Sequence, residues 1–163
     1  MDKDVVKKFK TIISQQIVLQ DQLKKLNIEM QNAINVRNLA EIRTLSAQID
    51  FTVEQMDNLE RNRIDLLTPY IEDKNRLKHI SSIIDEFPKE DISVIKKLHE
   101  DLKEKAFANF EQTKMNQLLL SEAVLDTHKN MEIINEQVNR PIRYGFGGKK
   151  QAALPVHLVN QRI

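Results

Sequence analysis

The sequence predicts an all-α protein, an elongated antiparallel helical hairpin with a third helix alongside it in a three-helix coiled-coil bundle, followed by a flexible C-terminal tail. Three observations carry this prediction. The chain has 163 residues but three glycines, against about eleven at average usage, and all three lie near its end. Apolar residues recur at spacings of three and four, the period of a helix face. Few breakers interrupt these stretches, so a small number of long helices must make up the fold.

The first expected helix covers about residues 3–35. Its apolar stripe keeps the three–four spacing for more than three heptads and contains one polar residue, Gln16. A buried polar group in such a stripe commonly fixes the register of a coiled coil, and we expect that role for Gln16. The stripe consists of Phe9, Ile12, Gln16, Leu19, Leu23, Leu26, Met30 and Ala33.

The second expected helix covers about residues 38–86 and opens with a capping box, in which Asn38 is the N-cap acceptor and Glu41 the carboxylate three residues later. Thr68-Pro69 breaks the pattern, because proline removes a backbone hydrogen bond and clashes with the preceding turn. The sequence leaves open a kink there or a restart with Thr68 as N-cap. The stripe before the break is Ile42, Leu45, Ile49, Val53, Met56, Leu59 and Leu66, and it resumes with Leu77, Ile80, Ile84 and Phe87.

The third expected helix covers about residues 88–139. It begins with a proline followed by carboxylates, which suits a helix start, and no breaker follows for some fifty residues. Beyond Met115 its apolar band widens, and three consecutive leucines cannot all face one side of a helix. We expect this band to contact more than one neighbour, and it suits a homodimer as well as another partner.

Charge divides the chain into a bundle, residues 1–139, and a tail, residues 140–163. The tail has five Lys/Arg and no Asp/Glu, against 20 basic and 24 acidic residues in the bundle, for a net charge of +1. So small a net charge creates no field that recruits nucleic acid or a membrane. The chain has no cysteine, a charged start and no long apolar run. We expect a cytoplasmic protein without a transmembrane segment.

No constellation of residues converges on catalysis, so we expect neither an enzyme nor a cofactor or metal site. The four histidines are scattered, and His128 with Glu132 supplies two metal ligands, fewer than a site needs. Lys150 follows Gly147-Gly148-Lys149 where a P-loop has Ser or Thr, and no strand precedes it.

The tail holds more apolar side chains than a solvating linker needs. Pro155 can start a short helix that places Val156, Val159 and Ile163 on one face. Two interpretations stay open: the tail folds back on the bundle, or it orders on a partner, which its basic bias and its glycines favour. The glycines end the third helix and form a hinge, which consists of Gly145, Gly147 and Gly148.

The order of three motifs resembles FlgN-type flagellar export chaperones. The first is the Glu-x-x-Arg stretch of Glu60 to Arg63, within VEQMDNLERNRIDLL. The second is the Asn- and Leu-rich segment KMNQLLLSEAVLDTHKNMEII, and the third is Tyr-x-x-x-Gly from Tyr144 to Gly148. The resemblance spans essentially the whole chain. Members often have a polar residue before the last glycine of the third motif, where this chain has Gly147.

The resemblance implies a chaperone that binds the helical termini of hook–filament junction proteins, keeps them unassembled and delivers them to a membrane protein of the export apparatus. It implies Tyr144 as a docking residue for the gate or the partner. The apolar residues that it implies for client contact are Val138, Ile142, Val156, Val159 and Ile163.

An alternative from another class is a generic coiled-coil scaffold or adaptor, whose basic tail anchors it to RNA or anionic lipid. The two differ in salt dependence. Binding through the basic tail should fall steeply with salt, because neutralised phosphates release counterions. A client interface with an apolar core should resist salt.

Overall fold

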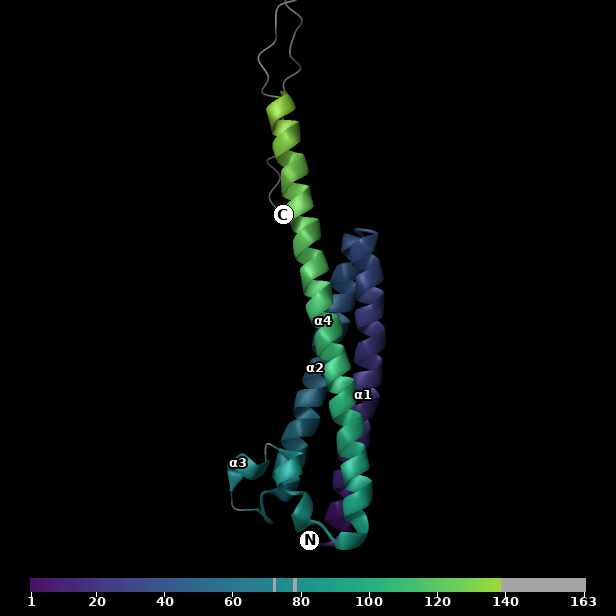
Figure 1. Ribbon diagram of the computed structural model, residues 1–163, viewed down its shortest axis with the longest axis vertical. Helices are drawn as coiled ribbons and strands as arrows, with labels where there is room; N and C mark the ends of the chain where they lie inside the picture. The colour runs from purple at the N-terminus through teal and green to yellow at the C-terminus, as the bar shows by residue number, and fades with distance from the viewer. Residues whose placement is uncertain (72, 78, 139–163) are drawn as a thin grey trace, which may run out of the picture. The chain divides into compact units, whose positions relative to one another are not determined.

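The computed structural model describes residues 1–71, 73–77 and 79–138, and every regular element in them is helical (Figure 1). The long helices are α1 (Lys3–Asn35), α2 (Leu39–Leu67) and α4 (Lys89–Val138). Between α2 and α4 lie the short α3 (Lys74–Leu77) and two 3-10 turns, η1 (Ile80–Ser82) and η2 (Ile84–Glu86). The predicted all-α class is confirmed. The chain divides into two compact units, Met1–Leu120 and Ser121–Ile163.

Helices α1 and α2 form an antiparallel hairpin (Figure 1). The turn between them is a Schellman motif, since Asn38 N donates to Ala33 O at 2.9 Å and Arg37 N donates to Ile34 O at 3.0 Å. Arg37 takes the left-handed position of this motif with φ 55°, where glycine is the usual residue. The predicted cap follows at once: Asn38 Oδ1 accepts from Glu41 N at 3.2 Å. The Glu41 carboxylate accepts from the Asn38 side-chain amide, whereas a full capping box uses the backbone N–H.

The first unit has two apolar cores. The large core lies where the start of α1, the end of α2, the segment 79–87 and the start of α4 meet. In it the rings of Phe9 and Phe87 pack with centroids 4.7 Å apart and planes tilted by 44°. Its buried members are Val6, Phe9, Ile13, Leu67, Ile71, Leu77, Ile80, Ile83, Ile84, Phe87 and Ile95. The small core, near the hairpin turn, consists of Leu26, Met30, Ala33, Ile34 and Leu45.

The break at Thr68-Pro69 is a complete helix end. The Thr68 hydroxyl donates to Ile64 O at 2.9 Å, and Ile71 N donates to Leu67 O at 3.2 Å. The long helix expected to resume through residue 86 is replaced by α3, η1 and η2. The reason is burial: the apolar residues expected to extend a stripe fold across the end of the bundle and enter the large core. We call the described residues between 68 and 88 the connector.

Helix α4 runs parallel to α1, because partners on the two helices advance together along the chain. Near the start, the Lys10 ammonium pairs with Asp91, and farther along Lys105 Nζ donates to Asp21 at 2.6 Å. The hydrogen bond to Asp21 is the main reason that the pKa of Lys105 is raised.

Beyond these ion pairs a set of amide side chains joins α1 and α4, and we call this set the amide interface. Asn116 Nδ2 donates to Asn27 O at 2.8 Å, and Asn109 Nδ2 donates to Gln20 O at 2.7 Å. Asn27 Nδ2 donates to the Thr113 hydroxyl at 3.2 Å. The backbones of α1 and α4 stay farther apart than those of α1 and α2, because these long polar side chains fill the space. The interface consists of Gln20, Asn27, Gln31, Asn109, Gln112, Thr113 and Asn116.

Candidate partner-binding surface

Most partner-binding residues predicted from the sequence lie outside the described residues. This holds for Ile142, Tyr144, Val156, Val159 and Ile163 and for the three glycines of the hinge. Val138 is the last residue of α4, and its side chain is likewise outside the description. For these positions the predictions stay predictions.

The second unit contains the end of α4, and its described large apolar side chains are exposed. Between residues 121 and 136 none of the side chains is buried. Val124 is 50% exposed, Met131 44% and Ile134 58%. Monomeric proteins seldom leave a run of such residues in water unless a partner covers it.

Three of these residues lie on one face of α4. At about 100° per residue, Val124, Met131 and Ile134 fall within about 80° of one another, and Thr127 lies between them. The Thr127 hydroxyl donates to Ala123 O at 2.8 Å, so this polar group is satisfied within the helix. We call Val124, Met131 and Ile134 the α4 stripe. Lys129, Glu122 and Glu136 lie on the opposite side of the helix.

The sequence indicated a widened apolar band from Leu118 to Val138, but it assigned the client contact to later residues. The signal for the α4 stripe was present in the spacing 124, 131 and 134, which keeps one phase. It was obscured because Leu125 and Ile133 lie outside that phase and are also exposed.

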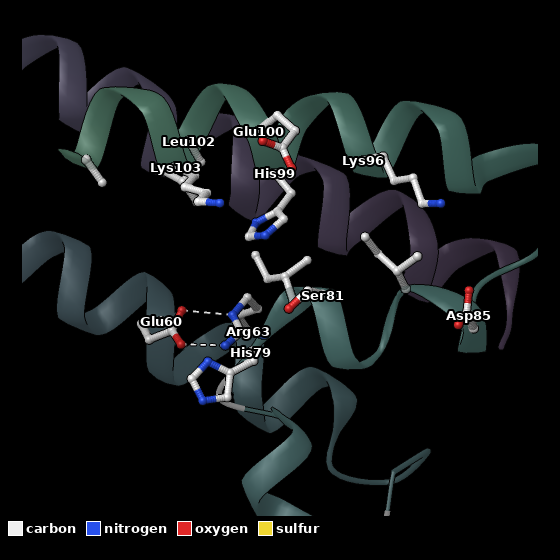
Figure 2. A pocket seen from close by; sticks show the side chains of 13 residues that line it. Glu60, Arg63, His79, Ser81, Asp85, Lys96, His99, Glu100, Leu102 and Lys103 are labelled. Atoms are coloured by element: carbon white, nitrogen blue, oxygen red, sulfur yellow. Dashed lines mark hydrogen bonds and ion pairs between the residues drawn. The ribbon is translucent and has the colours of Figure 1, made fainter. Parts of the chain in front are cut away.

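The Glu-x-x-Arg stretch of the resemblance is a partly buried ion pair in the first unit (Figure 2). Arg63, on α2, is 1% exposed, and its Nε donates to Glu60 Oε2 at 2.8 Å. Its Nη2 donates to Leu77 O at 2.7 Å and so ties α2 to the connector. Gln16 Nε2 donates to Glu60 at 3.3 Å, which links the polar residue in the α1 stripe to the same pair.

The surroundings of Glu60 act on its pKa in opposite directions. Burial by itself raises the pKa of the carboxyl, but the hydrogen bond and charge of Arg63, helped by the Gln16 amide, lower it by more. The pKa of Glu60 is therefore below its ordinary value of 4.5, and the pair is charged at neutral pH. The hydrogen-bonded, charged pair Glu60–Arg63 links α2 to the connector, and we call it the joint. Such a role is consistent with a motif that maintains the fold.

Two further features of the described chain bear on function. No set of three or more His, Asp or Glu side chains is placed there to hold a metal ion. None of the helices in that part is both long and apolar enough to cross a bilayer.

Comparison with known proteins identifies the family. A family model described as FlgN protein matches residues 1–152, which is nearly the whole chain. Comparison with curated proteins and with solved structures gave no significant match. The match includes the Glu60–Arg63 pair and all of α4. The chain therefore belongs to the FlgN family of flagellar export chaperones.

Proposed function

We propose that this protein binds the helical termini of hook–filament junction proteins in the cytoplasm, keeps them unassembled and delivers them to the export gate. Family membership supports a chaperone of flagellar export. The observation that carries the finer proposal is the α4 stripe, an exposed apolar face on a helix. Covering such a face with the apolar face of a client helix is the physical basis of chaperoning here.

The stripe has the geometry that a helical client needs. Residues spaced by three and seven positions present their side chains in one row, which packs against the row of another amphipathic helix. Burying each half-exposed side chain contributes about 1 kcal/mol. A few such contacts give binding that is specific yet reversible, which suits a client that must be released at the gate.

Residues beyond α4 complete the proposal. Ile142, Val156, Val159 and Ile163, together with Val138, extend the client-contacting set. Tyr144 is the docking residue for the export gate, and the glycines that follow it are the hinge that separates docking from client binding. This assignment rests on the family resemblance and on the basic, apolar composition of the tail.

The client contact is tested with Met131→Glu/Ile134→Glu, measured by calorimetric titration with the terminal helical segment of the cognate junction protein. Both side chains are exposed, so the circular dichroism spectrum and the melting temperature should stay unchanged. We expect binding to weaken at least about tenfold. The matched control is Lys129→Glu, which changes the net charge by the same amount on the opposite side of α4.

Other outcomes separate the alternatives. Equal binding by the double variant and the control contradicts the stripe as the client site. If the affinity of the complex falls steeply with added salt, the result supports the scaffold with an RNA- or lipid-binding tail. A fall in the self-association of the chain alone, seen by ultracentrifugation, assigns the stripe to a homodimer.

The docking role of Tyr144 has its own test. Tyr144→Ala should leave client affinity and the melting temperature unchanged and reduce secretion of the junction protein and motility. Normal secretion and normal motility in this variant would exclude the role.

A further inference from the structure

A groove in the first unit lies between α4 on one side and α2 with η1 and η2 on the other (Figure 2). It has a volume of about 750 Å³. Part of its lining is aliphatic, from Ile80, Ile84 and Leu102. A concave site of this size with an apolar lining and a few converging polar groups has the composition of a ligand site.

Two polar atoms in the lining lack partners. Arg63 is almost fully buried, and its Nη1 has no hydrogen-bond acceptor among the described residues, although Nε and Nη2 are both bonded. His99 Nδ1 is buried and likewise has no partner within the described chain. Figure 2 shows the His99 ring pointing from α4 into the groove, with Arg63 on the opposite wall. Leaving a buried guanidinium N–H without an acceptor costs free energy. An acceptor that binds there therefore gains more binding free energy than an acceptor at the surface.

The charges around the groove restrict what that acceptor is. Lys96 and Lys103 line it together with Arg63, but so do three carboxylates, Glu60, Asp85 and Glu100. The lining is therefore close to neutral, so its overall charge does not favour a multiply charged anion such as phosphate over a singly charged one. A single negative charge needs only the one open guanidinium donor and a lysine at the rim.

We propose that this groove binds a carboxylate presented beside an aliphatic side chain, as in an acidic residue of a peptide partner. The carboxylate accepts from Arg63 Nη1, with Lys103 and His99 near it, and the aliphatic neighbour lies on Ile80, Ile84 and Leu102. Arg63 then has two functions: its Nε and Nη2 hold the fold together, and its Nη1 receives the ligand. The proposal goes beyond the client contact of the α4 stripe, because no residue is shared between the two surfaces.

The test uses the full-length protein at pH 7 and three probes. These are acetyl-Leu-Asp-amide, its neutral counterpart acetyl-Leu-Asn-amide, and inorganic phosphate. Binding is followed in NMR spectra through the imidazole resonances of His99, with those of the exposed His128 in the second unit as the internal control. We expect the Asp peptide to shift His99 alone, with millimolar affinity, about tenfold more tightly than the Asn peptide or phosphate.

Substitutions locate the site. Lys103→Met should weaken the Asp peptide about two- to fivefold, because Lys103 is exposed at the rim. The matched control Lys114→Met, also exposed on α4 but outside the groove, should change nothing. Arg63→Lys keeps a charge beside Glu60 but removes Nη1, and it should abolish the difference between the two peptides. Arg63 also supports the fold, so its variant is interpreted only if it keeps the melting curve of the wild type. If it does not, the comparison of Lys103→Met with Lys114→Met decides.

Several results would overturn the proposal. Equal affinity for the Asp and Asn peptides would mean that the groove selects no carboxylate. Tighter binding of phosphate would assign a different anion, and shifts at His128 as large as those at His99 would show non-specific association. No shift of His99 at tens of millimolar Asp peptide would show that the groove is not a ligand site.

Discussion

Helix α1 makes two kinds of contact along its length. Its first turns enter the large core, where side chains such as Phe9 and Ile13 are surrounded by carbon. Farther along, the side that faces α4 meets amides, with Asn27 2% exposed and Asn109 and Asn116 buried opposite. The difference teaches that one helix can take its stability from apolar contacts and its register from polar ones. Apolar contacts are strong but tolerate sliding, whereas amide hydrogen bonds are modest in net energy and demand an alignment.

The largest expected effect lies in the large core. Phe9→Ala removes a fully buried ring that packs on Phe87, and we expect it to lower the free energy of unfolding by about 3–5 kcal/mol. Urea denaturation followed by circular dichroism measures this. Phe107→Ala is the control, since Phe107 is 66% exposed on α4 and its loss should cost under about 0.5 kcal/mol. Equal losses in the two variants would contradict the core as described.

The joint between α2 and the connector ranks second. Arg63→Met removes three hydrogen bonds and leaves Glu60 without its counter-ion. Because Glu60 is 40% exposed and rehydrates, we expect a loss of about 2–3 kcal/mol, below that of a fully buried pair. Gln16→Leu removes the weaker bond to the same carboxylate and should cost less than the arginine variant. The opposite order would contradict the joint.

The same joint makes stability depend on acid. Since the pKa of Glu60 is lowered below 4.5 in the folded protein, its contribution is complete above that pH and is lost as the pH falls through the lowered pKa. Unfolding free energies of the wild type should therefore drop more between about pH 6 and about pH 3 than those of Arg63→Met. Parallel pH profiles would show that the pair does not carry this dependence.

The amide interface should respond in a way that the large core cannot. Asn116→Ala removes the donor to Asn27 O and should cost about 1–2 kcal/mol. Asn27→Leu/Asn116→Leu replaces both amides by apolar groups and should stay within about 1 kcal/mol of the wild type. We expect the double variant to show faster amide hydrogen exchange along residues 105–116, because α4 can then slide along α1. If the double variant were as unstable as Phe9→Ala, the proposed difference between the amide interface and the large core would be wrong.

The smallest effect is expected at the hairpin turn. Arg37 occupies a left-handed position at φ 55°, which a residue with a Cβ adopts at a cost. Arg37→Gly should raise the free energy of unfolding by about 0.5–1 kcal/mol, measured as a shift of the urea midpoint at constant slope. A decrease would show that the contacts of the arginine side chain outweigh the backbone strain.

Much of this fold could be predicted from local patterns. The stripe of α1, the Asn38 cap and the break after Leu67 follow from helix periodicity, capping chemistry and the geometry of proline. Details of the stripes could not be predicted, because adjacent residues fit one spacing equally well. The structure buries Ile13 in preference to Ile12, and Thr52 in preference to Val53. Thr52 is tolerated in the interior because its hydroxyl donates to Gln48 O at 2.8 Å.

Features that depend on contacts between distant residues were beyond the sequence. Asn109 and Asn116 look like ordinary surface amides until α1 is placed against them. Arg63 is similar, since its neighbours along the chain do not indicate that it donates to the carbonyl of Leu77, fourteen residues later. The groove has no linear motif at all, because α2, the connector and α4 each contribute to it. The resemblance to a family identified the chaperone class, which no physical pattern in the helices specifies.

The tilted ring pair of Phe9 and Phe87 also supplies a spectroscopic reporter. The ring centroids lie 4.7 Å apart, so the ring current of each should displace proton resonances of the other. The chain has no tryptophan and six phenylalanines, which keeps this part of the spectrum sparse. Loss of the displaced lines during a titration would signal detachment of the segment around residue 87, even while the rest of the helices keep their ellipticity.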